Sequence, residues 1–396
     1  MMRLNSSLLD QAKAQTFGTG SLWASLRKDF RMNEVNSELV RRHESKFAAN
    51  SAYFDRTITR SKPYMYHIAT EVSKRTMPAE IALLPFIESA FVTKAKSHVG
   101  ASGLWQFMPA TGRHYGLEKT PLYDGRHDVY AATDAALNYL QYLHGLFGDW
   151  SLALAAYNWG EGNVGRAVNR ARAQGLEPVY ENLRMPNETR NYVPKLLAVR
   201  NIVNNPEYFG MSFADLDNKP FFKAVDIDQP IDLSAAVRLA NISQAEFDAL
   251  NPAFKSPVYI PKTGRKLLLP ATAIATFERN YKRADRASLL SWDVYTPYAD
   301  TTLSSIAAET GMSTAELKRL NGLSKESVAA GRSLLIAKNR FSGSPAAVPA
   351  NFAALDADIN PNDNKLQTVP NLNIAVTETT FKPSRQTVDI QTASAA

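Results

Sequence analysis

Cysteine is absent from this chain of 396 residues. Disulfide bonds, thiolate metal ligands, a cysteine nucleophile and a lipid-modified cysteine are therefore excluded within this sequence. Histidine is scarce as well, and the six histidines stand apart, without HExxH or another ligand spacing. We therefore expect no metal site, and nothing in the sequence indicates a cofactor.

Long apolar runs are also missing. The sequence has no stretch of about 18 apolar residues, so we expect no transmembrane segment. The start, Met-Met-Arg-Leu-Asn-Ser-Ser-Leu-Leu-Asp, lacks the apolar core of a signal peptide. Two interpretations stay open at this point: a cytoplasmic protein, or a chain whose targeting segment is missing from this sequence.

Blocks of like charge are the third absence, although the formal net charge is +7. A basic protein favours anionic partners such as nucleic acid, a membrane surface or an acidic cell-wall polymer. Lys and Arg are scattered, and they form no groove pattern with aromatic residues, which argues against nucleic acid. Solubility alone also explains the charge, and this interpretation stays open.

Helical periodicity is present over residues 35–206. The clearest example is the stretch 128–146, in which apolar residues recur at spacings of three and four. Nothing in this part of the sequence requires a sheet. We predict one all-helical domain over residues 35–210, with the segment 1–34 packing onto it.

An internal repeat follows the helical region. Residues 241–251 and 311–321 align without a gap at an offset of 70 (321 − 251). A short apolar strand precedes and follows each copy, which predicts two small β-α-α-β modules over residues 222–273 and 290–338. Residues 341–396 have no periodicity, and we predict a disordered tail. The predicted fold class is mainly α, with strands only in the two modules.

Glu88 is the candidate for chemistry in the helical region. Phe86 and Ile87 precede it, and Ala90 and Phe91 follow it. Burial disfavours the charged form of a carboxyl group and raises its pKa, which makes the group a proton donor closer to neutral pH. The alternative interpretation is an ordinary residue on a helix surface.

The local backbone is expected to place Glu88 near a helix terminus. We predict a helix from Met77 that Pro85 kinks or ends, so that Glu88 borders a cleft. Residues 111–116 (Thr-Gly-Arg-His-Tyr-Gly) are expected to form a turn.

Four motifs occur in a characteristic order. They are residues 88–91 (Glu-Ser-Ala-Phe), 100–109 (Gly-Ala-Ser-Gly-Leu-Trp-Gln-Phe-Met-Pro), 155–160 (Ala-Ala-Tyr-Asn-Trp-Gly) and 188–192 (Glu-Thr-Arg-Asn-Tyr). In this order they resemble the family 1 lytic transglycosylases, which have a goose-lysozyme-like helical fold. The two repeats resemble LysM peptidoglycan-binding modules, and together the resemblance covers about residues 20–338.

The two LysM-like repeats do not match equally well. The second repeat, at residues 290–338, is the better match. The first repeat lacks the usual Gly-Asp-Thr-Leu opening and has Pro-Ile-Asp-Leu at residues 230–233. The first module is therefore expected to be degenerate, and its sugar binding stays an open question.

The resemblance implies a reaction on peptidoglycan glycan strands. Family members cut the β-1,4 bond between N-acetylmuramic acid and N-acetylglucosamine and leave a 1,6-anhydro end. One glutamate, here Glu88, serves first as acid and then as base, and no cofactor is needed. The resemblance also implies a location in the periplasm or cell envelope. We expect a monomer that binds no nucleic acid.

The resemblance assigns roles to further residues. The sugar-contacting positions are Ser97, Gln106, Met108, Tyr157, Asn158 and Tyr192. Tyr192 also matches the tyrosine that positions the acid, while Ser89 and Glu188 are expected to have orienting or structural roles. Each has a simpler interpretation: Ser97 and Gln106 as turn or capping residues, and Met108 and Tyr157 as core.

Two rival functions stay open. A muramidase on the same fold would hydrolyse the bond, and a second ionised carboxylate facing Glu88 would favour it. The sequence offers no compelling candidate: Glu188 is the rival carboxylate, and a structural role is preferred for it. A non-catalytic peptidoglycan-binding scaffold would need a degraded acid site. Asp124 and Asp128 raise the alternative of a metal, but a solvated turn with local ion pairs, formed with Arg126, is the preferred interpretation. The sequence does not decide between cutting at chain ends and cutting within chains.

Overall fold

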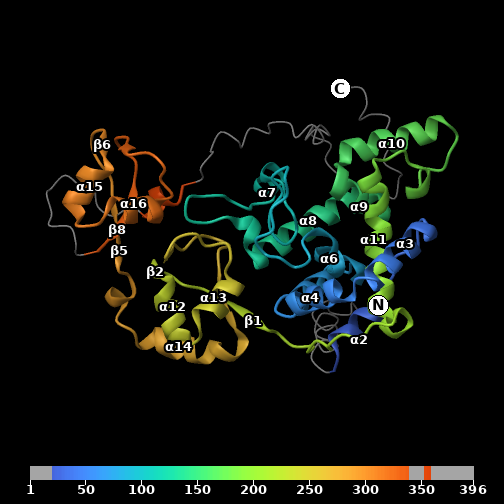
Figure 1. The fold of residues 1–396 in the computed structure, drawn as a ribbon, viewed down its shortest axis with the longest axis horizontal. Helices are drawn as coiled ribbons and strands as arrows, with labels where there is room; N and C mark the ends of the chain where they lie inside the picture. Colours follow the sequence, from blue (N-terminus) through green and yellow to red (C-terminus); the bar gives the residue numbers. More distant parts are fainter. Residues whose placement is uncertain (1–19, 339–351, 358–396) are drawn as a thin grey trace, which may run out of the picture. The chain divides into compact units, whose positions relative to one another are not determined.

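The computed structural model describes residues 20–338 and 352–357 (Figure 1). Contacts within the chain define two compact units. Among the described residues, the first unit holds 20–115 and 132–221. The second unit holds Gly116–Ala131 together with the described residues 222–338 and 352–357.

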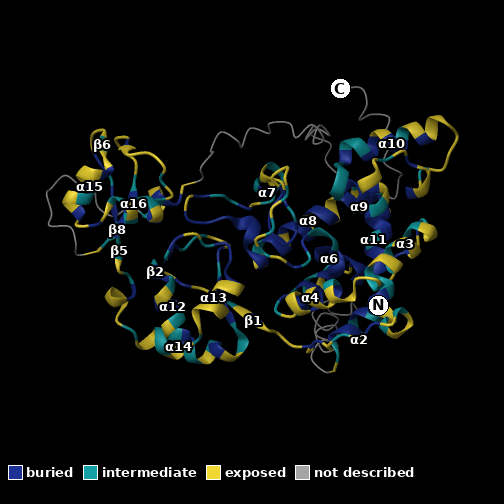
Figure 2. Ribbon diagram, in the orientation of Figure 1, coloured by how far each residue is buried: buried dark blue, intermediate teal, exposed yellow. Residues whose placement is uncertain are grey.

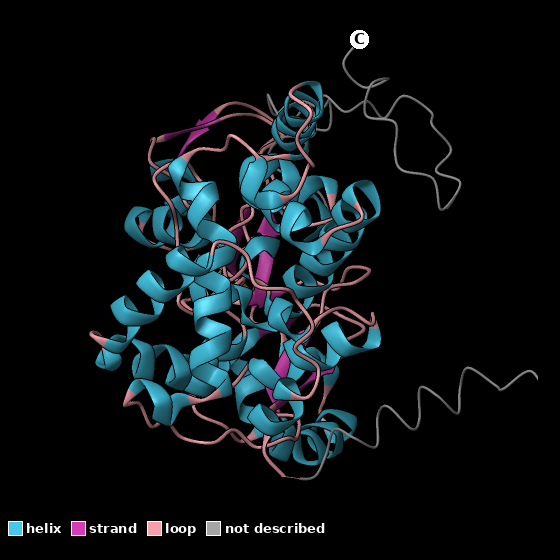
Figure 3. Ribbon diagram, turned by 90° about the vertical axis from the view of Figure 1, so that its right-hand side faces the viewer, coloured by secondary structure: helices cyan, strands magenta, loops and turns pink. Residues whose placement is uncertain are grey.

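Helices dominate the described chain, and its strands are short (Figure 3). The predicted mainly helical fold class with small strand-containing modules is confirmed. The first unit contains α2 (Leu22–Arg27), α3 (Ser37–Ala48), α4 (Ser51–Ser61), α5 (Met65–Lys74), η1 (Ala79–Leu83), α6 (Leu84–Glu88), α7 (Pro109–His114), α9 (Trp150–Trp159), α10 (Glu161–Ala173), η3 (Tyr180–Asn182), α11 (Asn187–Asn204) and η4 (Pro206–Phe209). Helix α8 (Val129–Phe147) belongs to the first unit except for its first turn.

Helix α11 forms the core of the first unit. Its residues from Tyr192 to Val203 are largely buried (Figure 2). It packs against α3, α9 and α6. Because an apolar helix surface of this length must be covered on several sides, α11 becomes the support for the elements around it.

Local sequence signals explain where several helices begin. The Asp149 carboxylate accepts a hydrogen bond from the Leu152 backbone N–H (2.8 Å) and caps α9. The Ser21 hydroxyl caps α2 by accepting from Ala24 N–H (3.2 Å). Side-chain oxygens at these positions satisfy backbone donors that the first helical turn leaves free.

Two local expectations differ from the structure. The helical run is interrupted next to Pro85, but as a 3₁₀ helix, η1, that ends at Leu83 rather than as one kinked helix; Pro85 itself lies in the first turn of α6, where its missing N–H costs little. The stretch 111–116 is mostly helical rather than a turn, because Pro109 opens α7 and presets the helical φ.

A buried carboxylate, Glu80, holds the N-terminal segment to the first unit. Its exposed fraction is 0 %. Its two oxygens accept hydrogen bonds from the backbone N–H groups of Arg31 (3.1 Å) and Met32 (2.9 Å). The Arg200 guanidinium of α11 lies 3.8 Å from the same carboxylate. The segment therefore packs on the first unit by means of a buried charge with fixed partners.

The second unit contains the two modules. In the first module β1 (Phe222–Val225) pairs antiparallel with β4 (Leu267–Pro270), and β2 (Ile231–Asp232) pairs with β3 (Val258–Tyr259). In the second, β5 (Trp292–Tyr295) pairs with β8 (Leu334–Ala337), and β6 (Thr301–Thr302) pairs with β7 (Ser327–Val328). The helices between the strands are α12 (Leu233–Ala240) and α13 (Gln244–Leu250) in the first module, and α15 (Leu303–Thr310) and α16 (Thr314–Asn321) in the second. The helix α14 (Ile274–Arg283) follows the first module.

An asparagine at the equivalent position of each repeat makes the same pair of hydrogen bonds. Asn251 donates to the Leu268 carbonyl (2.7 Å) and accepts from its N–H (2.9 Å). Asn321, 70 residues later, makes the matching pair with Leu335 (3.0 and 2.6 Å). In each module this side chain ties the end of the second helix to the last strand, so the aligned residues occupy equivalent positions.

The predicted disordered tail, residues 341–396, lies outside the described residues except for 352–357. Within this stretch α17 (Phe352–Leu355) is helical, and Leu355 and Asp356 are buried. This short part of the prediction was wrong, because the partners that order it lie far away in the sequence. In the described ranges, 20–338 and 352–357, no helix is both long enough and apolar enough to cross a membrane.

Candidate active site

Glu88 is the last residue of α6. Its side chain is partly exposed, while Phe86 and Leu84 on the same helix are buried. Ala90 (φ 47°) and Phe91 (φ 56°) directly after it have left-handed backbone conformations, which are costly for residues other than glycine. The chain therefore reverses sharply and packs Phe91 edge-on against Phe86, with 5.0 Å between ring centroids. Strain of this kind is typical of functional sites.

Burial raises the pKa of Glu88 to about 7. The Tyr192 hydroxyl donates a hydrogen bond to Glu88 Oε1, and this bond lowers the pKa of Glu88. The nearby positive charge of Lys195 lowers this pKa as well, whereas the negative charge of Glu188 raises it. Desolvation is thus the dominant cause, and the positive and polar neighbours only moderate it. A carboxyl group with this pKa is populated in both its acid and base forms near neutral pH.

Helix α11 supplies the groups that face Glu88. Tyr192 is 6 % exposed and reaches the carboxyl group from the second turn of this helix. Lys195 follows almost one turn later, and its ammonium group lies 3.5 Å from the Ile87 carbonyl oxygen. Burial lowers the pKa of Lys195. The sequence prediction included Tyr192 and missed Lys195, because a lone lysine in an apolar helix carries no motif.

Ser89 joins the end of α6 to the loop that follows. Its hydroxyl is buried and donates to the Leu104 carbonyl (2.8 Å). In the same loop the Ser97 hydroxyl accepts from Ala101 N–H (2.9 Å). These two serines therefore fix the backbone beside Glu88.

Gln106 is a second strained position, with φ 51°. Its side-chain amide donates to the carbonyls of Gly103 (2.8 Å) and Ala95 (3.3 Å). These bonds tie the loop to itself and hold Gln106 at the edge of a cleft. The residue is thus a turn residue and a cleft residue at once.

A cleft of about 110 Å³ brings four predicted residues together. They are Gln106, Met108, Tyr157 and Asn158. The Tyr157 hydroxyl donates to the Trp105 carbonyl (2.8 Å), which fixes the ring as one wall. Glu88, Ser97 and Tyr192 do not line this cleft, although the charge of Glu88 contributes to the raised pKa of Tyr157, after burial.

Asn158 and Glu188 are bonded to each other. The Asn158 amide donates to Glu188 Oε1 (3.3 Å), and its carbonyl accepts from the Thr189 hydroxyl (2.8 Å). These contacts join the end of α9 to the first turn of α11. The Glu188 side chain is exposed, and an acidic residue is favourable in the first turn of a helix.

Glu161 is a cleft residue that the sequence prediction missed. It lines the same cleft and is 0 % exposed. The Tyr139 hydroxyl donates to its Oε2 (3.0 Å), and burial raises the pKa of the carboxyl group. The only signal in the sequence was an acidic residue between the glycines that follow Trp159.

Removing the Tyr192 hydroxyl is expected to change the pH dependence of catalysis. Activity that needs protonated Glu88 falls as the pH rises through about 7. Tyr192→Phe removes a hydrogen bond that lowers the pKa of Glu88, so the fall should move to higher pH. Hydrogen bonds to charged groups contribute about 1.5–3 kcal/mol, and kcat should drop by at least about tenfold. A pH profile of kcat measures both effects.

Tyr180→Phe is the matched control for that experiment. Tyr180 is also a buried tyrosine, but its hydroxyl donates to the Thr189 carbonyl rather than to Glu88. The control should leave the position of the pH limb unchanged. If both variants shift the profile equally, Tyr192 has no specific effect on Glu88.

Comparisons with known proteins match three parts of the chain to known domains. The family described as transglycosylase SLT domain matches residues 65–179. The LysM-like domain of lytic transglycosylase MltD matches residues 221–286, and the LysM domain matches residues 300–337. Three of the four motifs lie within the first match, and the motif at 188–192 lies outside it.

Three relatives can be compared over different lengths. Membrane-bound lytic murein transglycosylase D of Escherichia coli is 37% identical over 330 residues, which are 80% of this chain and 73% of the relative. Soluble lytic murein transglycosylase of Salmonella typhimurium is 38% identical over 120 residues, 28% of this chain and 18% of that protein. Peptidoglycan transglycosylase gp16 of Escherichia phage T7 is 39% identical over 114 residues, 28% of this chain and 8% of that protein.

These matches confirm the family that the motifs indicated. The first relative is similar across both units, so the likeness is not limited to the transglycosylase part. The chain belongs to the lytic murein transglycosylase family, with a transglycosylase SLT domain followed by two LysM-type modules.

Proposed function

We propose that this protein is a peptidoglycan lytic transglycosylase in which Glu88 performs both proton transfers. The substrate is the glycan strand, cut between N-acetylmuramic acid and N-acetylglucosamine. Membership of the family supports the reaction class. The observation that carries the role of Glu88 is a partly exposed carboxyl group whose pKa is raised to about 7 and whose oxygen accepts from Tyr192.

In the first step Glu88 is the acid. Its carboxyl proton passes to the glycosidic oxygen, the C1–O bond breaks, and the N-acetylglucosamine side leaves as an alcohol. Positive charge develops at C1 of the muramic acid, where the substrate's own N-acetyl group stabilises it. Glu88 is left as a carboxylate, which Tyr192 and the charge of Lys195 stabilise.

In the second step Glu88 is the base. The carboxylate takes the proton of the muramic acid 6-hydroxyl, and O6 bonds to C1 to close the 1,6-anhydro ring. The carboxyl group regains its proton, so no water is consumed. A pKa near the working pH suits a group that must give and then take a proton within one cycle.

The surroundings of Glu188 favour this reaction over hydrolysis. Glycoside hydrolysis ordinarily needs a second carboxylate that acts on water or on the sugar. Glu188 is exposed and bonded to Asn158, and it acts on Glu88 only as a nearby charge. We propose a structural role for Glu188. We also propose that Gln106, Met108 and Tyr157 contact the glycan.

Product mass tests the reaction type. Wild-type protein incubated with purified peptidoglycan sacculi should release fragments with anhydro ends, each lighter by one water than the fragment with a reducing end. The released fragments are separated and weighed by mass spectrometry. Mainly reducing ends would instead identify a muramidase on the same fold.

The modules are proposed to hold the enzyme on its substrate. The LysM match at residues 300–337 supports binding to peptidoglycan, and the net charge of +7 suits an acidic polymer. A bound module raises the local concentration of glycan around the cleft. We further propose that the protein acts as a monomer in the cell envelope, in line with the name of its Escherichia coli relative.

A further inference from the structure

Residues Gly116–Ala131 lie within the transglycosylase match but belong to the second unit. The backbone of this segment pairs with the loop that follows α13 in the first module. Asp124 N–H donates to the Ala253 carbonyl (3.0 Å), and Lys255 N–H donates to the Leu122 carbonyl (2.8 Å). The Tyr123 and Phe254 rings pack with 5.3 Å between centroids. The segment is thus joined to the module by backbone bonds as well as side chains.

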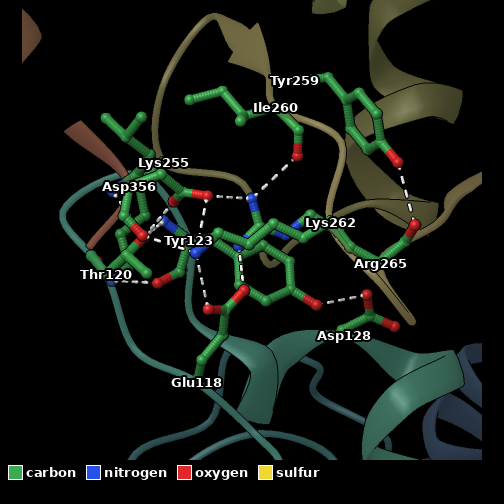
Figure 4. Close-up of polar contacts among 11 residues, drawn as sticks. Glu118, Thr120, Tyr123, Asp128, Lys255, Tyr259, Ile260, Lys262, Arg265 and Asp356 are labelled. Atoms are coloured by element: carbon green, nitrogen blue, oxygen red, sulfur yellow. Dashed lines mark hydrogen bonds and ion pairs between the residues drawn. The ribbon is translucent and has the colours of Figure 1, made fainter. Parts of the chain in front are cut away.

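A buried arginine of the module is the centre of the polar contacts (Figure 4). Arg265 is 5 % exposed and donates to both Glu118 and Asp356. Its guanidinium also lies 4.2 Å from the centroid of the Tyr123 ring. A charge buried to this degree needs partners, and two of them come from outside the module.

Lysines of the module strengthen the same contacts. The Lys262 ammonium donates to Glu118 Oε2 (2.9 Å) and to the Asp356 carbonyl (2.6 Å). The Lys255 ammonium donates to the carbonyls of Thr120 (3.1 Å) and Tyr123 (3.2 Å). Three cations of one module therefore face the segment and the end of α17.

Further hydrogen bonds connect this segment to Asp356 and to the first turn of α8. The Thr120 hydroxyl donates to Asp356 Oδ1 (2.7 Å), and the Tyr123 hydroxyl donates to Asp128 Oδ2 (2.7 Å). Asp128 in turn accepts from Ala131 N–H (2.9 Å) in the first turn of α8. The anchored stretch thus extends from Glu118 to the beginning of that helix.

Comparison of the two repeats shows that this loop is used differently in each. Asn251 and Asn321 mark the same position in the two modules. In the first module the residues that follow, 251–253 and 256, are buried. In the second module the equivalent residues, 321–326, are exposed except for the partly buried Asn321 and Leu323. The difference arises because residues 122–124 cover the loop of the first module.

We propose that the first LysM-like module is a docking module for the chain's own segment 118–128 and Asp356, and that its 251–256 loop does not bind glycan. The surface that stays open in the second repeat is occupied here by protein. The docking role does not depend on catalysis by Glu88, whereas the assignment of glycan to the second module rests on the proposed function.

Hydrogen exchange of the full chain tests the docking. Arg265→Gln removes the buried cation, and Glu118→Gln weakens the same contacts from the segment side without touching the module's core. In both variants the amides of residues 118–125 should exchange at least about tenfold faster than in the wild type. Lys266→Gln is the matched control, because Lys266 is the next residue and pairs with exposed Asp226. It should leave these amides unchanged.

Two results would overturn the proposal. One is unchanged exchange over 118–125 in Glu118→Gln, which stays testable even if Arg265→Gln does not fold. The other comes from adding an N-acetylglucosamine oligomer to the wild type: slower exchange at 251–256, or faster exchange at 118–125, would mean that glycan binds the covered loop. Protection confined to 321–326 supports the proposal. Absence of protection in both loops counts against glycan binding by the modules, not against docking, which the variants decide.

Discussion

Glu88→Gln will lower the release of anhydro-ended fragments from sacculi by about 10²–10⁴-fold, the range that one general acid–base group contributes. The amide has nearly the same shape as the carboxyl group, and its oxygen still accepts from Tyr192. It has no acidic proton for the leaving oxygen and no basicity for the 6-hydroxyl. Because one residue serves both steps, the loss should lie towards the upper end of the range. Turnover of sacculi by mass spectrometry measures it, and sacculus binding should stay intact.

Glu188→Gln is the matched control for the acid. It carries the same change into a second acidic residue whose charge acts on Glu88 and whose side chain is exposed. The control should lose little activity, since the amide oxygen of the variant can still accept from Asn158. An equal loss in both variants would point to two catalytic carboxylates and to hydrolysis. Activity near the wild-type level in Glu88→Gln would remove Glu88 from the mechanism.

Glu80→Gln will lower the free energy of unfolding of the first unit by about 3 kcal/mol. Glutamine keeps the shape but has one oxygen in place of two. Either Arg31 N–H or Met32 N–H then faces an amide NH₂ group in a site that is 0 % exposed, and Arg200 loses its buried counter-charge. Urea denaturation followed by tryptophan fluorescence measures the change, because four of the five tryptophans lie in the first unit.

Glu34→Gln is the control that distinguishes the buried hydrogen bonds of Glu80 from its charge interaction with Arg200. Glu34 pairs with the same arginine at 3.5 Å but is 44% exposed. Exposed pairs contribute about 0–1 kcal/mol, so this variant should change the unfolding free energy far less. Similar losses in the two variants would show that the charge of Arg200, and not the buried backbone bonds of Glu80, controls stability.

The sequence predicted those features that local patterns carry. The spacing of apolar residues in 128–146 predicted α8, and the repeated asparagines at 251 and 321 marked equivalent positions in two modules of similar structure. The apolar neighbours of Glu88 predicted a raised pKa, in the direction that the structure gives. In each case the pattern that carried the prediction could be read directly from the sequence.

Features that depend on distant partners could not be predicted in this way. Glu118 and Arg265 are 147 residues apart, and Thr120 and Asp356 are 236 residues apart. Neither pair has a pattern that a single sequence reveals, so α17 and the unit to which the segment 116–131 belongs were missed. Lys195 and Glu161 were missed for a different reason: each is one charged residue in a helix, and only the fold shows what it faces.

The left-handed backbone at Ala90 and Phe91 links the stability of the fold to the position of Glu88. A glycine at position 90 would relax the backbone, since it adopts this φ without a steric cost. It would also free the turn that directs Glu88, so greater stability and lower turnover would accompany each other. The strained backbone at Ala90 and Phe91 thus positions Glu88 and lowers the stability of the folded protein.

The discontinuous second unit limits where this chain can be divided. A fragment that ends at residue 221 keeps all four motifs but leaves Leu122 and Tyr123, both buried in the full chain, without the loop that covers them. The first LysM-like module therefore cannot be exchanged without the segment 116–131 that packs on it. Division after residue 286 would also cut this unit, because Leu122, Val258 and Ile260 share one buried apolar cluster with residues of the second module such as Val294 and Leu335. The length of the smallest stable fragment should therefore reflect the whole second unit.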